Sequence, residues 1–343
     1  MKGIPVHRHI VVAILTWLAV TPVSALEPIG KPGWSGYVSL GMGFGGVKTN
    51  LLDSVSGFDV ALGKDRIKDL GSPSTENLVL PMFAAEVGYT FSNGKTRFFL
   101  GNDFRDYVQF DRSTVFALRH DFKGFGTMQL AYLSTPLANT EVYADPYQTN
   151  AKREGTDFNE DGLRLTWDRI FGTGFELKVS VTEADLDRER SGQALELSAE
   201  DQALLDRNGD ILNAELGYLF NVGGRHFLRP SIVYIDRDLD GEAMATDGIL
   251  FELSHVYSQP EGGLRVVSKA SYGQQDSDTI NPIFGRKLEG DRYSLASTVY
   301  FGGAFGWKNW VPNAGFFYAK ADPDIEFYES ELWGLSAGVF RRF

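Results

Sequence analysis

The chain has 343 residues, of which 33 are basic and 45 acidic, and its formal charge at pH 7 is −12. This acidic excess excludes the attraction to phosphates on which nucleic-acid binding depends. The absence of cysteine excludes a disulfide framework and a lipid-anchored amino-terminal cysteine. The 38 glycines and the 13% share of aromatic residues favour a membrane β-barrel, which needs tight turns and aromatic belts.

Residues 1–25 predict a secretory signal peptide. Lys2 and Arg8 precede the apolar run "IVVAILTWLAV", and the small residues of "TPVSA" indicate cleavage after Ala25. The apolar run is shorter than the roughly 20 residues that a membrane-spanning helix requires. Cleavage leaves residues 26–343, with 31 basic and 45 acidic side chains and a formal charge of −14. We expect this segment to form one outer-membrane β-barrel.

The next notable stretch is "GYVSLGMGFGG" at 36–46, in which Gly41, Gly43 and Gly46 match the dinucleotide-binding pattern G-x-G-x-x-G. A genuine site of this kind needs a helix directly after the glycines. The residues that follow have no clear helical stripe, and apolar side chains stand at every second position from Val38 to Phe44. This two-residue period favours a β-strand over a nucleotide site.

Short turn-forming stretches flanked by aromatic residues recur along the chain. Asn-Gly and Gly-Gly pairs accept the positive φ of tight hairpins, and aromatics at one level on both strands are typical of a membrane-interface girdle. The six stretches are "YTFSNGKTRFF", "HDFKGFGT", "WDRIFGTGF", "YLFNVGGRHF", "HVYSQPEGG" and "VYFGGAFGW". They predict six turns on the periplasmic side of a barrel.

Alternating segments between these turns predict about fourteen strands from Trp34 to Phe343, in an all-β, transmembrane, antiparallel up-and-down barrel. Longer polar connections alternate with the six turns and are expected on the outer side. The long ones are predicted at 46–78, 138–160, 184–208, 236–247 and 273–290, and two short ones near 103–111 and 320–324. A soluble β-sandwich would alternate too, but it would not need aromatic girdles.

The chain ends in "WGLSAGVFRRF", with apolar residues at alternate positions from Trp333 to Phe343, although Arg341 breaks the pattern. This end resembles the terminal strand of outer-membrane barrels, in which a final aromatic residue is recognised by the barrel-insertion machinery. Phe343 is therefore the expected insertion signal. The segment "PIGKPGWSGYVSLGMGFGGVKTN" at 28–50 resembles a proteobacterial family of outer-membrane β-barrels known only as a domain of unknown function. This resemblance implies the architecture and no mechanism.

Residues that alternate with the apolar faces are expected to line the interior, where water makes charged side chains tolerable. The candidates are Arg97, Arg119, Arg164, Lys178, Arg229, Arg265, Lys269, Arg292, Glu86, Glu176, Glu215 and Glu252. This basic lining fits either a conducting pore or a ladder of paired charges that fills a closed interior. Fourteen strands predict a narrow pore or one that loops plug, and the first outer loop is the expected plug.

The outer connections carry a second pattern. "DRDLDGEAMATD" at 236–247 matches the spacing of a calcium loop, with Asp236, Asp238, Asp240 and Asp247 as candidate ligands. "DFNEDG" at 157–162 and "DRNGD" at 206–210 repeat part of it. Asp, Asn and Gly are also ordinary loop residues, and the flanking helices of an EF-hand are missing. "LSAEDQALLDRNG" predicts a short outer helix capped by Ser198.

These features predict a porin-like passive channel for small polar or anionic solutes in the bacterial outer membrane. The alternative is a plugged structural or receptor barrel that displays acidic loops with candidate calcium ligands. A barrel hydrolase is less favoured, because Ser254 and His255 are neighbours on a strand and point to opposite faces. No catalytic residue and no cofactor other than calcium is predicted. The expected partners are outer-membrane lipid, lipopolysaccharide, the insertion machinery and a second copy in a homo-oligomer, but no nucleic acid.

Overall fold

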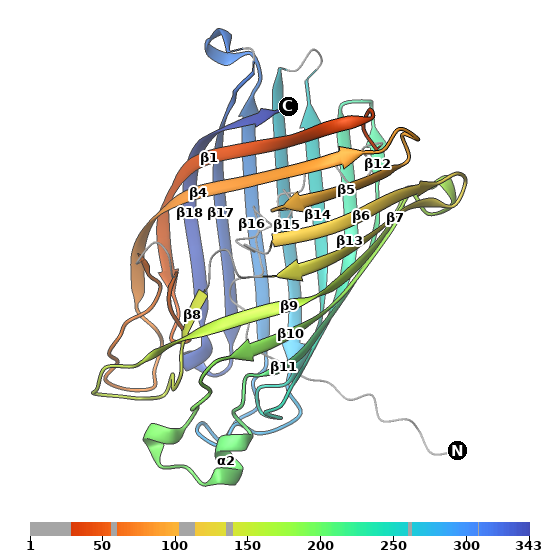
Figure 1. Cartoon of the computed structure of the whole chain (residues 1–343). Coiled ribbons are helices and arrows are strands. Elements are labelled where there is room, and N and C mark those ends of the chain that lie inside the picture. The colour runs from red at the N-terminus through yellow and green to blue at the C-terminus, as the bar shows by residue number, and fades with distance from the viewer. Residues whose placement is uncertain (1–28, 56–59, 103–113, 135–139, 260–262, 308) are drawn as a thin grey trace, which may run out of the picture.

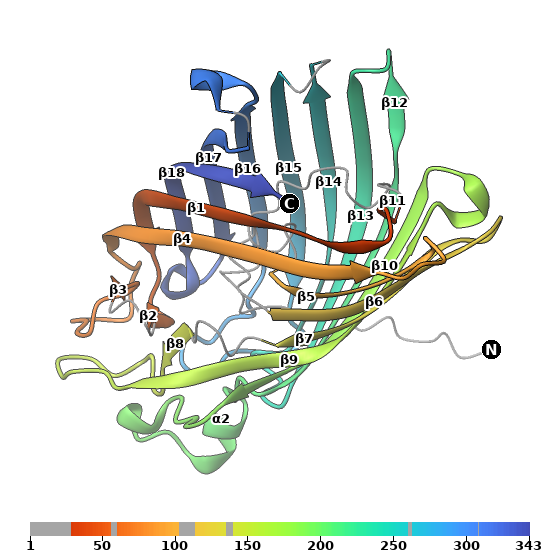
Figure 2. The ribbon, with the colours of Figure 1, turned by 45° about the horizontal axis from the view of Figure 1, so that its top comes forward.

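The computed structural model describes residues 29–55, 60–102, 114–134, 140–259, 263–307 and 309–343. The predicted signal peptide and the short connection near 103–111 lie outside these ranges. The described chain is almost entirely β-structure, and its strands form one antiparallel sheet that closes on itself (Figures 1 and 2). Within the described part, no helix is long and apolar enough to cross a membrane.

Fourteen strands build the wall, as predicted, and β11 and β12 are two parts of one strand interrupted at Leu219. Each strand pairs antiparallel with its neighbours in chain order, and β18 closes the barrel on β1. The strands are β1 (Gly33–Lys48), β4 (Thr75–Thr90), β5 (Thr96–Gly101), β6 (Thr114–Phe122), β7 (Gly126–Ser134), β9 (Gly155–Asp168), β10 (Phe175–Leu186), β11 (Gly209–Tyr218) with β12 (Phe220–Val222), β13 (His226–Leu239), β14 (Thr246–Ser258), β15 (Leu264–Asp276), β16 (Gly290–Phe301), β17 (Val311–Pro323) and β18 (Ser330–Arg342).

The two faces of the wall have opposite character. On β1, Leu40, Met42 and Phe44 are about half exposed, whereas Ser39 and Val47 on the other face are buried. The same alternation continues around the barrel, so that large apolar side chains cover the outside. Exposed apolar area of this extent is unfavourable in water and is the surface that lipid requires. The stretch that resembled a nucleotide motif is therefore β1, with no helix after it.

Glycines shape the junction where the barrel closes. Gly41 and Gly338 are directly opposed across β1 and β18, and so are Gly45 and Gly334. A Cβ at Gly45 would lie 1.9 Å from the carbonyl oxygen of Trp333, closer than any real atom could come. Glycine lets the two strands bend into a corner, because it carries no side chain on the concave side. We call this junction the glycine corner.

The two ends of the barrel differ, as predicted. The six aromatic-flanked stretches form the short connections at one end, which also holds the carboxyl terminus, and we call it the turn end (Figure 1). The other end, the loop end, carries the long connections. Several of these are shorter than expected, because the strands continue further. The loop predicted at 236–247 shrinks to 240–245, since cross-strand hydrogen bonds hold polar residues in extended conformation despite their preference for turns.

The loop end also contains short strands and a short helix. The first long connection contains β2 (Leu52–Val55) and β3 (Val60–Ala61), and β2 pairs with β8 (Thr140–Tyr143). The predicted outer helix is α2 (Ala199–Ala203), and the Ser198 hydroxyl caps it by accepting a hydrogen bond of 3.1 Å from the Asp201 amide. Single turns of 3-10 helix lie at Gln193–Leu195 and Glu326–Tyr328 at the loop end, and at Ile170–Gly172 and Ala304–Gly306 at the turn end.

The described part of the chain has three clusters of buried apolar residues, and two of them involve the connections at the loop end. One joins β2 to the inner face of the wall, where Leu52 and Val55 belong to the same cluster as Leu78, Leu80 and Val47. The second lies among the outer connections and contains Leu51, Tyr147, Leu205, Leu239, Met244, Ala245, Leu288, Ile325, Phe327 and Tyr328. The outer connections therefore share one core, and we call this assembly the outer cap.

Candidate functional site

The interior of the barrel carries most of the candidate side chains. All twelve charged residues predicted to line it lie on wall strands, at positions that alternate with the outward apolar residues. In a closed barrel, such positions face the inside. They fall on β4 to β16, and we call this part of the inner face the charged wall.

The centre of the charged wall is a four-membered ion network on β10, β11 and β13. Arg229 lies 2.6 Å from Glu176 and 2.5 Å from Glu215, and Lys178 lies 2.8 Å from the other oxygen of Glu215. These side chains are at most 18% exposed. Removing one member would leave a poorly solvated charge without its partner, which is more costly than the intact network.

Two further ion pairs between neighbouring strands extend the charged wall on either side. Lys269 on β15 lies 2.7 Å from Glu252 on β14. Arg97 on β5 lies 2.8 Å from Glu86 on β4. Each pair joins neighbouring strands through side chains as well as through the backbone.

Arg119 on β6 pairs with a residue that the sequence analysis missed. Its guanidinium lies 2.8 Å from Asp168 at the end of β9, across β7. Asp168 stands beside a predicted turn, and only its alternation with Trp167 could have marked it as an inward residue. Arg164, Arg265 and Arg292 also occupy inward positions, and each interacts with neighbouring groups.

The rest of the inner face is uncharged between its ends. The inward positions of Ser294–Tyr300 on β16, Val311–Pro323 on β17, Leu332–Phe340 on β18, Tyr37–Val47 on β1 and Leu78–Ala84 on β4 carry only small, hydroxyl, amide, apolar or aromatic residues. We call this part the uncharged wall. The interior is therefore divided into two chemically different sectors, and this division was not predicted.

The outer cap is held by buried polar groups in addition to its apolar core. The hydroxyls of Tyr147 and Tyr328 lie 2.5 Å apart, and the Asn281 amide donates to Tyr328 at 2.8 Å. Burial raises the pKa of both tyrosines above the ordinary value, so both hydroxyls are neutral at physiological pH. The cap links connections that are far apart in sequence, since Tyr147 and Tyr328 are separated by 181 residues and the hydrogen-bonded Asn50 and Phe327 by 277.

Arg153 anchors the first outer connection. Its guanidinium donates to the backbone oxygens of Asn50, Lys64 and Pro146 and lies 3.7 Å from the ring centre of Tyr143. It is 1% exposed, and burial lowers its pKa from the ordinary value. The expected plug segment is thus fastened to the neighbouring connection by one buried side chain.

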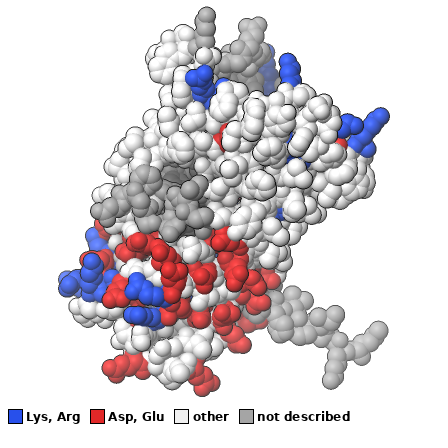
Figure 3. All heavy atoms as spheres, in the orientation of Figure 1, with Lys and Arg blue, Asp and Glu red and all other residues white. Residues whose placement is uncertain are grey.

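Acidic residues form a band on the outer surface near the loop end. They are direct cross-strand neighbours, and Figure 3 shows acidic side chains gathered in the lower part of the visible face, where the outer connections lie. We call this band the acidic belt, and it comprises Asp161, Glu183, Asp210, Asp236, Asp238, Asp247 and Asp276. Like charges placed opposite one another in a sheet repel, so the belt costs stability unless cations screen it.

The proposed calcium loop is not a loop in the structure. Asp236 and Asp238 belong to β13 and Asp247 to β14, while Asp240 lies in the turn between them. Asp236 faces Asp247 directly across the two strands. Among the residues described, no three acidic or histidine side chains converge in a way that would hold a metal ion. Calcium binding by these carboxylates stays a prediction.

Two other candidates have clear positions. Phe343 follows β18, and its backbone exchanges hydrogen bonds of 3.0 and 3.1 Å with Gly36. Its side chain is largely exposed, so it is accessible, and its recognition by insertion machinery stays a prediction. Arg341, which broke the apolar pattern, lies 5.7 Å from the ring centre of Trp310, where a cation–π contact accommodates its charge.

The three described histidines have hydrogen-bond partners other than serine. His255 lies 3.0 Å from His226, and His120 lies 2.8 Å from the Thr96 hydroxyl. Ser254 is buried on the inner face, as the strand alternation predicted. In the described part of the chain, no serine is a hydrogen-bond partner of a histidine.

Taken together, the closed wall, the apolar outer face and the charged inner face define a transmembrane β-barrel. Residues 33–340 match the model of a family described as "Protein of unknown function (DUF2860)", and the chain belongs to this family. This membership confirms the resemblance to an uncharacterised barrel family. A search of curated proteins found no match.

Solved structures with a similar course of the chain are outer-membrane proteins. The outer membrane channel DcaP of Acinetobacter baumannii has 12% identity and a TM-score of 0.42, covering 92% of this chain and 99% of that one. An outer membrane channel from Pseudomonas putida F1 has 9% identity and a TM-score of 0.41, covering 93% and 98%. OpdQ of Pseudomonas aeruginosa has 10% identity and a TM-score of 0.36, covering 90% and 97%. Likeness at this level does not assign a solute.

Proposed function

We propose that this protein is a porin-like channel of the bacterial outer membrane, through which small polar or anionic solutes diffuse passively. The observation that carries the proposal is the inner face, which bears charged side chains on one sector and uncharged polar ones on the other. A barrel that served only as a wall would not need charged groups inside, because pairing them costs desolvation. Water in a lumen removes much of that cost.

The balance of charges supports a weak preference for anions. Among the predicted interior residues, eight are basic and four acidic, and Asp168 adds a fifth acid. The ion pairs neutralise much of this charge locally, but basic side chains still outnumber acidic ones among these residues. A preference that arises in this way is modest and falls as salt screens the charges.

A second candidate is a plugged structural or receptor barrel, and the outer cap favours it. Connections from six parts of the chain share the core of the cap, which includes Tyr147, Leu205 and Phe327. Such a cap narrows the entrance, and it would present the acidic belt and the loops to the outside. Divalent cations are the expected ligands of that surface, and lipopolysaccharide and outer-membrane lipid its expected partners.

Recordings from planar bilayers containing the refolded protein test the proposal. We expect unitary currents in KCl, with a reversal potential in a salt gradient that indicates a slight excess of anion flux. The control is the same barrel with Leu205→Ala, which loosens the cap. Currents that appear only in this variant would support the plugged barrel, and silence of both proteins would reject the channel.

Two remaining expectations belong to the same proposal. We infer that the barrel has no hydrolytic activity, because its histidines pair with threonine or with each other. Incubation of the detergent-purified protein with labelled phospholipid tests this, and release of fatty acid would contradict it. Insertion through Phe343 and assembly into a homo-oligomer are open to measurement by deletion of that residue and by cross-linking in membranes.

A further inference from the structure

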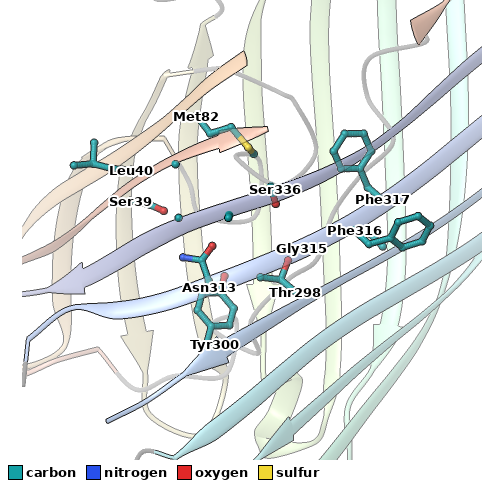
Figure 4. Close-up of a pocket in the computed structure, with 14 residues that line it drawn as sticks. Ser39, Leu40, Met82, Thr298, Tyr300, Asn313, Gly315, Phe316, Phe317 and Ser336 are labelled. Carbon is teal, nitrogen blue, oxygen red and sulfur yellow. The ribbon is translucent and has the colours of Figure 1, made fainter. Parts of the chain in front are cut away.

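The uncharged wall contains a pocket at the glycine corner (Figure 4). It is formed by β1, β4, β16, β17 and β18, and it opens on the inner face of the barrel. Its lining combines the hydroxyls of Ser39, Thr298 and Ser336 and the amide of Asn313 with the rings of Tyr300 and Phe317. The pocket therefore offers hydroxyl groups, an amide and aromatic side chains but no charged group.

The polar groups of this pocket have spare hydrogen-bonding capacity. Among the described residues, the side chains of Ser39, Thr298, Asn313 and Ser336 form no hydrogen bond to another residue. The charged wall is different, because its acids and bases are bonded to one another. Hydroxyls elsewhere on the inner face can pair as well, as the 2.6 Å contact between Ser271 and Ser294 shows. The pocket therefore offers donors and acceptors that the protein itself does not use.

Glycines keep the pocket open. Gly41, Gly315 and Gly338 all contribute to its lining. A Cβ at Gly315 would lie 2.7 Å from the Ser336 hydroxyl and 3.1 Å from that of Thr298, so even one methyl group would occupy the space between these two groups. The φ angle of Gly315 is not positive, so alanine can adopt the same backbone conformation. A methyl group at this position would therefore fill the pocket without straining the backbone.

We propose that this pocket is a binding site for an uncharged polyhydroxylated solute of the sugar or polyol class, a proposal that rests on the channel function. Each hydroxyl of such a solute can donate and accept, which matches the serine, threonine and asparagine side chains. The C–H face of a sugar ring can pack on an aromatic side chain such as Tyr300. An anion would enter the pocket without a counter-charge, and an apolar solute would leave the polar groups unsatisfied. The charged wall therefore serves ions, and the glycine corner serves neutral solutes.

The test uses the full-length barrel, with D-glucose as the probe and D-gluconate as an anion of similar size. In planar bilayers, glucose should reduce the KCl current reversibly and saturably, and gluconate should not do so through this pocket. Asn313→Ala, Ser336→Ala and Gly315→Ala should each raise the half-blocking concentration of glucose at least fivefold, with little change in the KCl conductance. Ser271→Ala, which alters a paired hydroxyl on the charged wall, is the matched control.

A binding measurement separates the pocket from the channel. Calorimetric titration of the detergent-solubilised protein with glucose does not depend on conduction. If the protein passes no current but binds glucose, and the pocket variants weaken this binding, the pocket is supported and the channel is rejected. Normal currents with neither block nor heat from glucose would reject the pocket and leave the channel intact. Equal block of the wild type and all three pocket variants would also overturn the assignment.

Discussion

Arg229 on β13 lies 2.6 Å from Glu176 on β10, although β11 lies between these two strands. The guanidinium therefore extends across the inner face of a whole strand, and on the way it also contacts Glu215. Backbone hydrogen bonds link only adjacent strands, so this contact ties together strands that the sheet itself does not connect. The side-chain network thus holds the wall together in addition to the backbone hydrogen bonds.

Replacing Arg229 with methionine should destabilise the barrel. The substitution leaves Glu176 without its cation and Glu215 with only Lys178, and the expected loss is on the order of 3 kcal/mol. Urea unfolding in lipid vesicles, followed by tryptophan fluorescence, measures it. The matched control is Arg265→Met, which removes another inward arginine from outside this network. If both variants unfold at the wild-type urea concentration, the network contributes nothing to stability.

The same variant should also change ion selectivity. Arg229→Met removes one positive charge and leaves two carboxylates exposed to the lumen, so the reversal potential in a KCl gradient should move towards cations. Glu176→Gln should move it in the opposite direction. A shift of the same sign in both variants would mean that these side chains do not face the permeating ions.

Side chains added at the glycine corner should impair folding of the barrel. Gly45→Ala should lower the refolded fraction and cost about 1–3 kcal/mol, because the added Cβ meets the Trp333 carbonyl oxygen, which belongs to the backbone and cannot move freely. Gly43→Ala is the matched control, since its Cβ would meet the flexible sulfur end of Met82 at 3.0 Å. Heat-modifiable electrophoretic mobility reports folding. Equal folding of the two variants would show that the corner tolerates side chains.

The outer cap should loosen without loss of the barrel. Leu205 is completely buried in the cap core, so Leu205→Ala should cost the cap about 2–5 kcal/mol. Protease digestion of intact vesicles should then cut within 187–208 and 240–245, while the wall remains protected. Ile280→Ala changes an exposed residue of another outer connection and should have no effect. Unaltered digestion of the Leu205 variant would contradict a cooperative cap.

The cap should also respond to acid through Glu329. Burial favours the protonated form of this carboxyl, but hydrogen bonds from Lys48 at 2.6 Å and Ser72 at 3.0 Å outweigh it and lower the pKa below the ordinary value. A lowered folded-state pKa means that the stabilising contribution of this carboxylate is complete above the unfolded pKa of about 4.5 and disappears as the pH falls through the folded value.

Hydrogen exchange at residues 324–329 measures this contribution. Protection should be constant at neutral pH and should fall in acid below the ordinary titration range of a glutamate. Glu329→Gln should already show the lower protection at pH 7 and should respond little to acid. Glu326→Gln, at an exposed position on the same turn, should behave like the wild type. Identical acid responses of the wild type and Glu329→Gln would exclude this carboxyl.

Much of the architecture could be predicted from local sequence. Strand alternation and aromatic-flanked turns depend on neighbouring residues, and they yielded the fourteen strands, the separation of short and long connections at opposite ends and the short helix after Ser198. Alternation also placed residues such as Arg97 and Glu252 on the inner face, because the side-chain period of a strand is fixed by backbone geometry. The connection predicted at 236–247 is shorter in the structure for a related reason. Its acids suit a turn locally, but β13 and β14 extend through them once each has a partner strand.

The tertiary structure alone decided which of these residues meet. Arg119 pairs with Asp168 and Arg229 with Glu176, each two strands away, and Tyr147 meets Tyr328, which lies 181 residues later in the chain. No local pattern encodes such distances, because they arise from the curvature and closure of the whole sheet. The sequence by itself determined a barrel with an apolar outer face and a polar inner face. Closure divided that inside into a charged wall and an uncharged wall, since only the order of strands around the ring decides which inward side chains are neighbours.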